Sequence, residues 1–385
     1  MNPATKSPKL LLIGIGDVTI RLAHLLATGD QPVDLVMAGR SLERATRFAN
    51  LTKLSASNLG RFRDVEALAL DLTDIDRTAA EIRRIQPDLI FMGASIQAAR
   101  AIMDISPDAF RKLDQAQLGP WLPMHLALNY ELMQAVRLAE SRAIVVNAAY
   151  PDAVGPALAT IGLAPHVGIG NIANVVPGIT WAAAQELDAH PSEIDISLVC
   201  HHYFSHHVHR FGEAHGIPYR LAVSRDGEEV AVEHDAIFAR LAANLRRQGG
   251  KDGQQVTATS AARLIWALLG SETRRVHSPA PAGLPGGYPL RVSRGQIDVV
   301  LPEGLSQDEA QDVNRRAQKL DGIERISPDG TVVFAREQMS VLNDLLGYDC
   351  DRINVVDARD AATELKAKYE RYVERIGSPR SAGLV

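Results

Sequence analysis

The chain has 385 residues, of which 46% are hydrophobic and 23% are charged, and its formal net charge is −5. This composition is ordinary for a soluble globular protein of about two domains, and the net negative charge argues against a nucleic-acid binder. No apolar run is long enough to cross a membrane, and residues 1–9 lack the apolar core of a signal peptide. With only two cysteines, Cys200 and Cys350, we expect no disulfide framework and a cytoplasmic location.

Residues 9–44 combine the features of a strand, a glycine turn, a helix and a second strand. The apolar run at residues 10–13 predicts a buried parallel strand, and the turn Gly14-Ile15-Gly16 follows it. Helical spacing of apolar residues comes next, at Val18, Leu22, Leu25 and Leu26. A second apolar run, residues 33–38, predicts the next strand.

This order of elements predicts a dinucleotide site. Gly14 would allow the sharp turn, and Gly16 would let the backbone approach a pyrophosphate at the positive N-terminus of the helix. Thr19 stands where a third glycine is usual. Gly14, Gly16 and Asp17 are expected to hold the pyrophosphate, and Val18 and Thr19 are expected to belong to the same cofactor site.

The end of the second strand indicates which dinucleotide is bound. Sites for NAD usually place a carboxylate there to hold the ribose 2′-hydroxyl, whereas this chain has Gly39-Arg40-Ser41, with Arg44 one helical turn later. Because a guanidinium pairs with a 2′-phosphate, we predict NADP rather than NAD. The alternative is that both arginines are solvated surface charges around a structural turn.

Two more strands extend the pattern. Residues 67–74 predict a third strand that ends near Asp71 and Leu72, where a polar group could meet the adenine. Residues 89–92 predict a fourth strand, and the small residues after it, Gly93-Ala94-Ser95, would leave room for ribose and nicotinamide. Residues 96–124 carry several prolines and predict an irregular loop over the site.

A fifth strand at residues 143–146 ends in Asn147, which we expect near the nicotinamide. Five strands with helices between them predict an α/β fold with a Rossmann-type, doubly wound parallel sheet over residues 1–152. Residues 153–385 mix helices with antiparallel hairpins, as expected of an α+β domain that binds substrate and could form a homodimer.

Histidine suits the proton transfer that accompanies hydride transfer, because its pKa lies near neutrality. A cluster of histidines occupies residues 201–209, and the run from Ile194 predicts that His201 and His202 end a strand. We assign the proton to His202, with His201 and Tyr150 as orienting groups. Residue 154 is Val, so Tyr150 lacks the lysine partner typical of short-chain reductases.

A metal site is the alternative for the same cluster. His207 and His209, two apart on a strand, would share a face and could hold zinc or manganese. No cysteine-rich or His-Glu-x-x-His pattern supports this, so we expect no metal. The remaining alternative is that most of these histidines are surface or interface residues.

Two families resemble this chain. Residues 9–95, through Gly14-x-Gly16, Ala38-Gly39-Arg40-Ser41 and Leu70-Asp71-Leu72, resemble the NADP-binding domain of saccharopine dehydrogenase-like reductases. The overall layout is similar to the lactate/malate dehydrogenase superfold and the related NAD-dependent glycosidases. That second resemblance implies that Asn147 contacts the cofactor and that His202 or His201 is the acid/base.

The chain also departs from the second family. The substrate-binding arginine expected after the glycine turn at residues 168–171 is replaced by Asn174-Val175-Val176, and the glycosidases' metal-binding cysteine is absent. A 2-hydroxy-acid substrate is therefore not supported. The sequence predicts an NADP-dependent oxidoreductase acting on a small carbonyl, hydroxy, imine or amino compound. The alternatives are a redox-neutral lyase or glycosidase with tightly bound NAD(P), a non-catalytic NADP sensor, and a scaffold that binds no dinucleotide.

Overall fold

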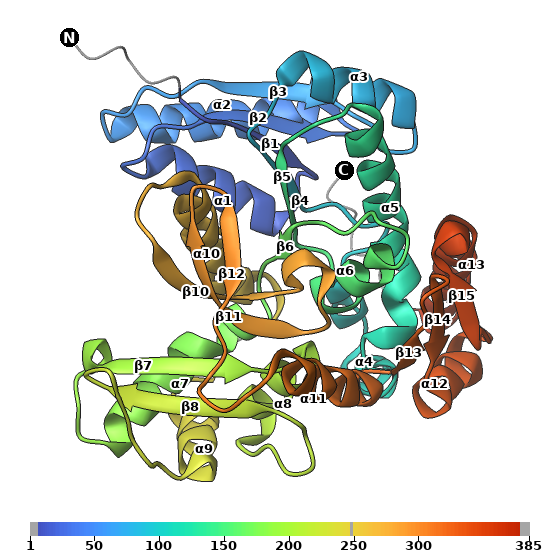
Figure 1. Ribbon diagram of the computed structural model, residues 1–385. Coiled ribbons are helices and arrows are strands. Elements are labelled where there is room, and N and C mark those ends of the chain that lie inside the picture. The colour runs from blue at the N-terminus through green and yellow to red at the C-terminus, as the bar shows by residue number, and fades with distance from the viewer. Residues whose placement is uncertain (1–6, 247–248, 378–385) are drawn as a thin grey trace.

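The computed structural model describes residues 7–246 and 249–377. A six-stranded parallel sheet lies at the centre of the N-terminal half, in the order β3-β2-β1-β4-β5-β6 (Figure 1). Its strands are β1 (Lys9–Ile13), β2 (Asp34–Gly39), β3 (Val65–Ala69), β4 (Leu89–Met92), β5 (Ile144–Asn147) and β6 (Val167–Gly168). The predicted doubly wound α/β sheet is confirmed.

Both faces of this sheet are buried, which explains why its strands are continuous apolar runs. Leu10 and Leu12 of β1 pack on one face, whereas Leu11 and Ile13 pack on the other, because successive side chains alternate across a strand. The first face is covered by α1 (Asp17–Thr28), α2 (Leu42–Asn58) and α10 (Gly250–Leu269), and the second by α3 (Ile75–Ile85) and α5 (Leu122–Leu138).

The later half of the chain shares these cores. Strand β6 completes the sheet from beyond residue 152, and α10 packs directly against α1. The cluster on the second face includes Ile323, Phe334 and Tyr369 from near the C-terminus. Parts of residues 153–246 and 249–377 therefore cover the N-terminal sheet on both sides, while the predicted domain boundary at residue 152 stays a prediction.

Three small antiparallel sheets fill the rest of the structure (Figure 1). One contains β7 (Ile194–Val199), β8 (Arg220–Arg225) and β9 (Glu228–Glu229), and packs with α7 (Ile172–Glu186), α8 (His202–Phe211) and α9 (His234–Asn244). The second contains β10 (Arg274–Pro279), β11 (Gly287–Ser293) and β12 (Gln296–Val299). The third contains β13 (Ile323–Ile326), β14 (Thr331–Phe334) and β15 (Arg352–Asn354), beside α12 (Arg336–Leu346) and α13 (Ala358–Arg375). Helices α6 (Pro151–Ala159) and α11 (Gln307–Leu320) connect these parts.

The segment at residues 96–124 is more regular than predicted. It forms the short helices η1 (Ala99–Asp104), α4 (Pro107–Asp114) and η2 (Gly119–Trp121). Its prolines start helices instead of breaking them: Ser106 caps α4, and Pro107 occupies the first turn, where a missing N–H costs nothing. Within residues 7–246 and 249–377, every helix is too short or too polar to cross a membrane.

The histidine cluster is helical, so the prediction that it ends a strand was wrong. Strand β7 stops at Val199, and His201 is the N-cap of α8. The sequence carried the signal: Phe204 and Val208 are four residues apart and fully buried, and Gly212 ends the helix in the left-handed conformation.

Candidate active site

The turn between β1 and α1 fits a pyrophosphate. Gly14 has a φ of +90°, and a Cβ there would lie 2.7 Å from the backbone nitrogen of Ala94, so both conformation and space require glycine. A Cβ on Gly16, by contrast, would meet no atom within 4 Å. Gly16 is the N-cap of α1, whose first N–H groups have no partner within the helix. Open space beside this helix N-terminus suits an anion.

Thr19 replaces the usual third glycine by packing against another glycine. Its side chain is 1% exposed, and a Cβ on Gly93 would lie 2.3 Å from its Oγ1. The close approach of helix to sheet is therefore achieved by removing the side chain after β4 rather than on α1. Val18, Thr19, Gly93 and Ser95 all line the same cavity.

Arg44 and Ser41 shape the glycine turn. The Nε and Nη2 atoms of Arg44 each donate a hydrogen bond to the carbonyl oxygen of Ile15, at 3.0 Å. Ser41 is the N-cap of α2, and its Oγ accepts a hydrogen bond from the Arg44 backbone N–H. The Arg44 guanidinium, which was predicted to contact a 2′-phosphate, thus uses two of its nitrogens to hold the glycine turn.

Arg40 and Asp71 lie at the ends of neighbouring strands. Arg40 is exposed just beyond Gly39. The backbone hydrogen bond from Thr73 lowers the pKa of Asp71, and the charge of nearby Arg40 lowers it further. Leu72 is 4% exposed and belongs to the core, so it presents no side chain to an adenine. Of the predicted residues at this end, Arg40 is the cation that faces solvent.

Asn147 ends β5 but its side chain does not line the cavity. It is 1% exposed, its Oδ1 accepts from the Ala149 N–H at 2.8 Å, and its Nδ2 donates to the Ala149 carbonyl at 3.1 Å. Ala148 and Ala149 line the cavity instead. Asn147 therefore fixes the turn that carries them.

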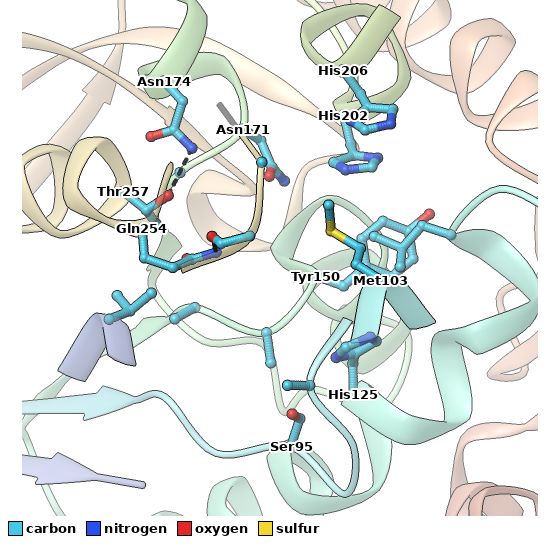
Figure 2. A pocket seen from close by; sticks show the side chains of 18 of the residues that line it. Ser95, Met103, His125, Tyr150, Asn171, Asn174, His202, His206, Gln254 and Thr257 are labelled. Atoms are coloured by element: carbon cyan, nitrogen blue, oxygen red, sulfur yellow. Dashed lines mark hydrogen bonds between the residues drawn. The ribbon is translucent and has the colours of Figure 1, made fainter. Parts of the chain in front are cut away.

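A cavity of about 660 Å³ extends from the glycine turn to α8. It opens at the carboxyl ends of β1 and β4, where the strand order reverses and dinucleotide folds bind their ligands. Figure 2 shows Asn174, Thr257 and Gln254 on one side of it, His202 and His206 on another, and Tyr150, His125 and Ser95 below them.

A buried carboxylate joins His202 and Tyr150 at the far end of this cavity. Asp321 is 1% exposed; its Oδ2 lies 2.9 Å from His202 Nδ1 and accepts a hydrogen bond from the Tyr150 hydroxyl at 2.7 Å. Burial raises the pKa of Asp321, but the facing His202 and the hydrogen bonds outweigh it and hold that pKa below its ordinary value. An ionised Asp321 only accepts, so His202 Nδ1 must carry the proton toward it. The Nε2 atom of His202 is then the one that can exchange a proton with a ligand.

A second carboxylate fixes the backbone of His202. Asp152 is fully buried, accepts from the His202 backbone N–H at 2.9 Å, and also accepts from the Asn171 side-chain amide. The Asp321 backbone is held in turn, because its carbonyl accepts from the Gly119 N–H at 2.6 Å. His202 thus has its ring and its main chain fixed by different parts of the fold.

His201 and Tyr150 have supporting positions. His201 is fully buried, its Nδ1 accepts from the Tyr203 N–H, and burial lowers its pKa, so it is neutral. Its Nδ1 lies 3.7 Å from Asp321 Oδ2, too far for a hydrogen bond. Burial, and then Asp321, raises the pKa of the Tyr150 phenol well above its ordinary value. Tyr150 therefore remains a donor to Asp321.

The sequence analysis missed three residues of this site: Asp321, Asp152 and His125. His125 is 4% exposed, lines the cavity from α5, and stands edge-on to the Tyr150 ring at 6.1 Å between centroids. Burial lowers its pKa to about 4, and nearby His202 contributes, so it is neutral. Asp152 could have been found from the sequence, because it directly follows Tyr150-Pro151 at the end of the fifth strand. No local sequence pattern marks Asp321.

The metal alternative has no support in the part of the chain that the structure describes, since no group of three metal-ligating side chains comes together there. His207 and His209 lie on a helix, where residues two apart point in different directions, so they do not share a face as they would on a strand.

No protein-family model matches this chain. No curated protein matches it in sequence either. Solved structures do match in shape. Malate dehydrogenase from Plasmodium falciparum has a TM-score of 0.54 at 14% identity, over 82% of this chain and 99% of that one. Lactate dehydrogenase from Eimeria maxima, with NADH and oxamate, has a TM-score of 0.54 at 15% identity, over 82% and 91%.

Lactate dehydrogenase from Cryptosporidium parvum, complexed with lactic acid and nicotinamide adenine dinucleotide, has a TM-score of 0.55 at 16% identity, over 82% of this chain and 99% of that one. At such low identity the likeness establishes the fold. The layout expected from the lactate/malate dehydrogenase resemblance is confirmed, whereas the resemblance to saccharopine dehydrogenase-like reductases stays a prediction. The chain therefore has the fold of the lactate and malate dehydrogenases.

Proposed function

We propose that this protein is an NADP-dependent oxidoreductase that transfers a hydride between nicotinamide and a carbonyl, hydroxy or imine substrate. The observation that carries the proposal is one cavity with a glycine turn at one end and the His202–Asp321 pair at the other. The matched structures support the nicotinamide-dependent oxidoreductase, because their printed names are those of dehydrogenases and two of them hold NADH or nicotinamide adenine dinucleotide with a ligand. The preference for NADP rests on Arg40 alone, since the cofactors of those two structures are NADH and NAD.

The residues present fit a dinucleotide. Gly14 and Gly16, with the first turn of α1, would hold the pyrophosphate; Arg40 and Ser41 would hold the 2′-phosphate. When bound, the nicotinamide supplies or accepts the hydride. Gly93, Ser95 and Ala149 leave room for it beside the sheet.

His202 would move the proton. In the reducing direction, its Nε2 donates a proton to the substrate oxygen or nitrogen as the carbon gains the hydride; in the oxidising direction, Nε2 accepts that proton. Asp321 stabilises the positive charge that His202 carries before donating, and Tyr150 holds the carboxylate in place. Asp152 fixes the main chain of His202, so the ring keeps its direction.

A titration with NADPH and NADH tests the cofactor. Loss of a charge-assisted contact should cost about 1.5–3 kcal/mol, so Arg40→Ala should weaken NADPH binding about 10- to 150-fold and leave NADH affinity unchanged. Arg47→Ala is the matched control, because Arg47 lies in α2, which begins just after Arg40, and its guanidinium lies over the Phe48 ring. If NADPH and NADH bind with equal affinity and Arg40→Ala changes neither, NAD would be favoured. Absence of binding to both dinucleotides would refute the proposal.

The proton role needs a second experiment. His202→Gln should retain NADPH affinity but abolish NADPH oxidation with carbonyl substrates. His190→Gln, in an exposed turn before β7, should behave as wild type. Full activity of His202→Gln would show that another group moves the proton.

A further inference from the structure

The cavity beyond the cofactor position has one apolar wall. It comes from the segment between β4 and the start of α5 and consists of Ile102, Met103, Phe110, Leu118, Trp121 and Met124. Trp121 and Met124 are buried, with exposed fractions of 3% and 1%, whereas Met103 is 41% exposed. The wall is therefore anchored in the core and ends in a side chain at the cavity mouth.

Met103 reaches across that mouth. A Cβ on Gly249 would lie 2.8 Å from the terminal methyl of Met103, so this side chain touches the backbone that begins α10. Met103 and His202 both line the cavity, and Figure 2 shows them projecting into it from different elements. An apolar side chain thus lines the same cavity as His202.

The fixed charges around the cavity cancel. Among its described lining residues, the side chains with permanent charge are Asp17, Asp114, Arg210 and Arg246. Arg210 Nη1 lies 2.7 Å from Asp114 Oδ2, so its charge is already neutralised by a neighbour. Arg246 is exposed at the end of α9, where water screens it.

The side facing the apolar wall is neutral. Asn174 Nδ2 donates to Thr257 Oγ1 at 3.1 Å, and Asn174 Oδ1 accepts from Ser260 Oγ at 3.3 Å, so this amide is satisfied within the protein. Asn171 donates to Asp152. Among the described residues of the apolar wall and of this amide network there is no permanent cation, and His202, when protonated, is already paired with Asp321. A carboxylate on the reacting carbon would therefore lose water here without gaining an unpaired cation, which is costly.

We propose that the substrate is an uncharged carbonyl compound or alcohol with a bulky apolar body, and that the site rejects 2-oxo and 2-hydroxy acids. The proposal rests on the proposed oxidoreductase function for the reacting group. What this inference adds is the class of substrate, which follows from the apolar wall and the neutral amide network that share the cavity with His202. The apolar body would lie against Phe110, Leu118 and Trp121, and the reacting oxygen would face His202 Nε2.

Ligand binding tests this without needing turnover. Three matched pairs of acid and primary amide, with phenylethyl, cyclohexylethyl and hexyl groups, are titrated by calorimetry into the protein with and without saturating NADP⁺. We expect at least one amide to bind at least tenfold more tightly than its acid. An acid that binds as tightly as its amide, or no binding in all three pairs, would overturn the proposal.

A variant pair locates the binding. Phe110→Asn should weaken amide binding at least fivefold, while Phe62→Asn, at an 84% exposed phenylalanine outside the cavity, should leave it unchanged. Met103→Ser is the second wall variant, and thermal unfolding confirms that each variant folds. Unchanged amide binding in both wall variants would overturn the assignment. NADPH titration reports the proposed function separately, since amides could bind a protein that binds no dinucleotide.

Discussion

The two ends of the cavity are built differently. The end where we propose that the dinucleotide binds, called the dinucleotide end below, comes from one short stretch, residues 14–19, whose backbone conformation creates the space. The end where we propose proton transfer comes from side chains far apart in sequence: Tyr150 and Asp152, His202, and Asp321. One end is a property of local geometry, and the other exists only when three separate elements meet: the start of α6, the start of α8 and the end of α11.

This difference decides how each end responds to change. A backbone site is damaged by adding atoms, whereas a side-chain site is damaged by removing a partner and leaving a charge buried. The two ends should therefore fail in different measurements, cofactor affinity for one and rate for the other. Four experiments separate them.

The largest effect is expected at Asp321. Asp321→Asn removes the anion that sets the tautomer and charge of His202, and comparable changes in catalytic histidine–carboxylate pairs lower kcat by roughly 10⁴-fold. For carbonyl reduction, which needs protonated His202, we expect kcat to fall by about 10³- to 10⁴-fold, and the decline of the rate on the alkaline side of the pH–rate profile to move to lower pH. Steady-state kinetics across pH measures both. Asp312→Asn, on the exposed side of α11, is the control, and a rate within tenfold of wild type would contradict the role of Asp321.

A pH experiment addresses His125, which lines the cavity beside Tyr150. Its folded pKa is about 4, below the ordinary value of 6.5, so the unfolded chain binds a proton first as pH falls. Stability from this group is complete above pH 6.5 and is lost as pH drops toward 4, by roughly 3 kcal/mol in all. His125→Gln should flatten the pH dependence of the unfolding free energy by that amount in urea titrations. Parallel curves would show that His125 is not buried as a neutral ring.

The glycine pair tests the dinucleotide end. Gly14→Ala forces a side chain into a left-handed conformation against Ala94, which should cost about 1–3 kcal/mol of stability or more. Gly16→Val places its atoms in open space, so its melting temperature should stay near that of wild type while NADPH affinity falls at least tenfold. Calorimetry and dinucleotide titration distinguish the two. Wild-type NADPH affinity in Gly16→Val would mean that no pyrophosphate lies there.

The smallest effect is expected at Thr19. Its Oγ1 is buried without a hydrogen-bond partner among the described residues. Thr19→Val therefore removes a polar atom whose loss of hydration on folding is not offset by a hydrogen bond. Stability should change by less than about 1 kcal/mol, in the stabilising direction, with unchanged NADPH affinity. A tenfold loss of affinity would instead show that the hydroxyl contacts the cofactor.

The sequence was informative where function depends on the local chain. The parallel sheet could be predicted from apolar runs. The turn could be predicted from its glycines, because a position such as Gly14 accepts no other residue. The assignment of the proton to His202 came from its position after a strand, and the structure brings it into the cavity although it starts a helix.

The rest could not be read from the sequence for physical reasons. Asp321 follows an amphipathic helix and is an ordinary residue of a helix–strand junction until the fold places it against α8. His125 lies inside an apolar helix, where a buried histidine has no distinguishing pattern. Asn147 was predicted to contact the cofactor because it ends a strand. Its side chain instead forms two hydrogen bonds with the backbone of Ala149, and sequence spacing does not reveal such local bonds.

The position of Asp321 in the chain also bears on how the protein is made. Translation supplies the glycine turn early and Asp321 late, and the same C-terminal stretch supplies Ile323, Phe334 and Tyr369 to the core on one face of the parallel sheet. Because that core needs both parts of the chain, neither the sheet nor the His202–Asp321 pair is complete until the C-terminal part has packed. A prematurely terminated copy would therefore lack a complete core as well as the carboxylate beside His202.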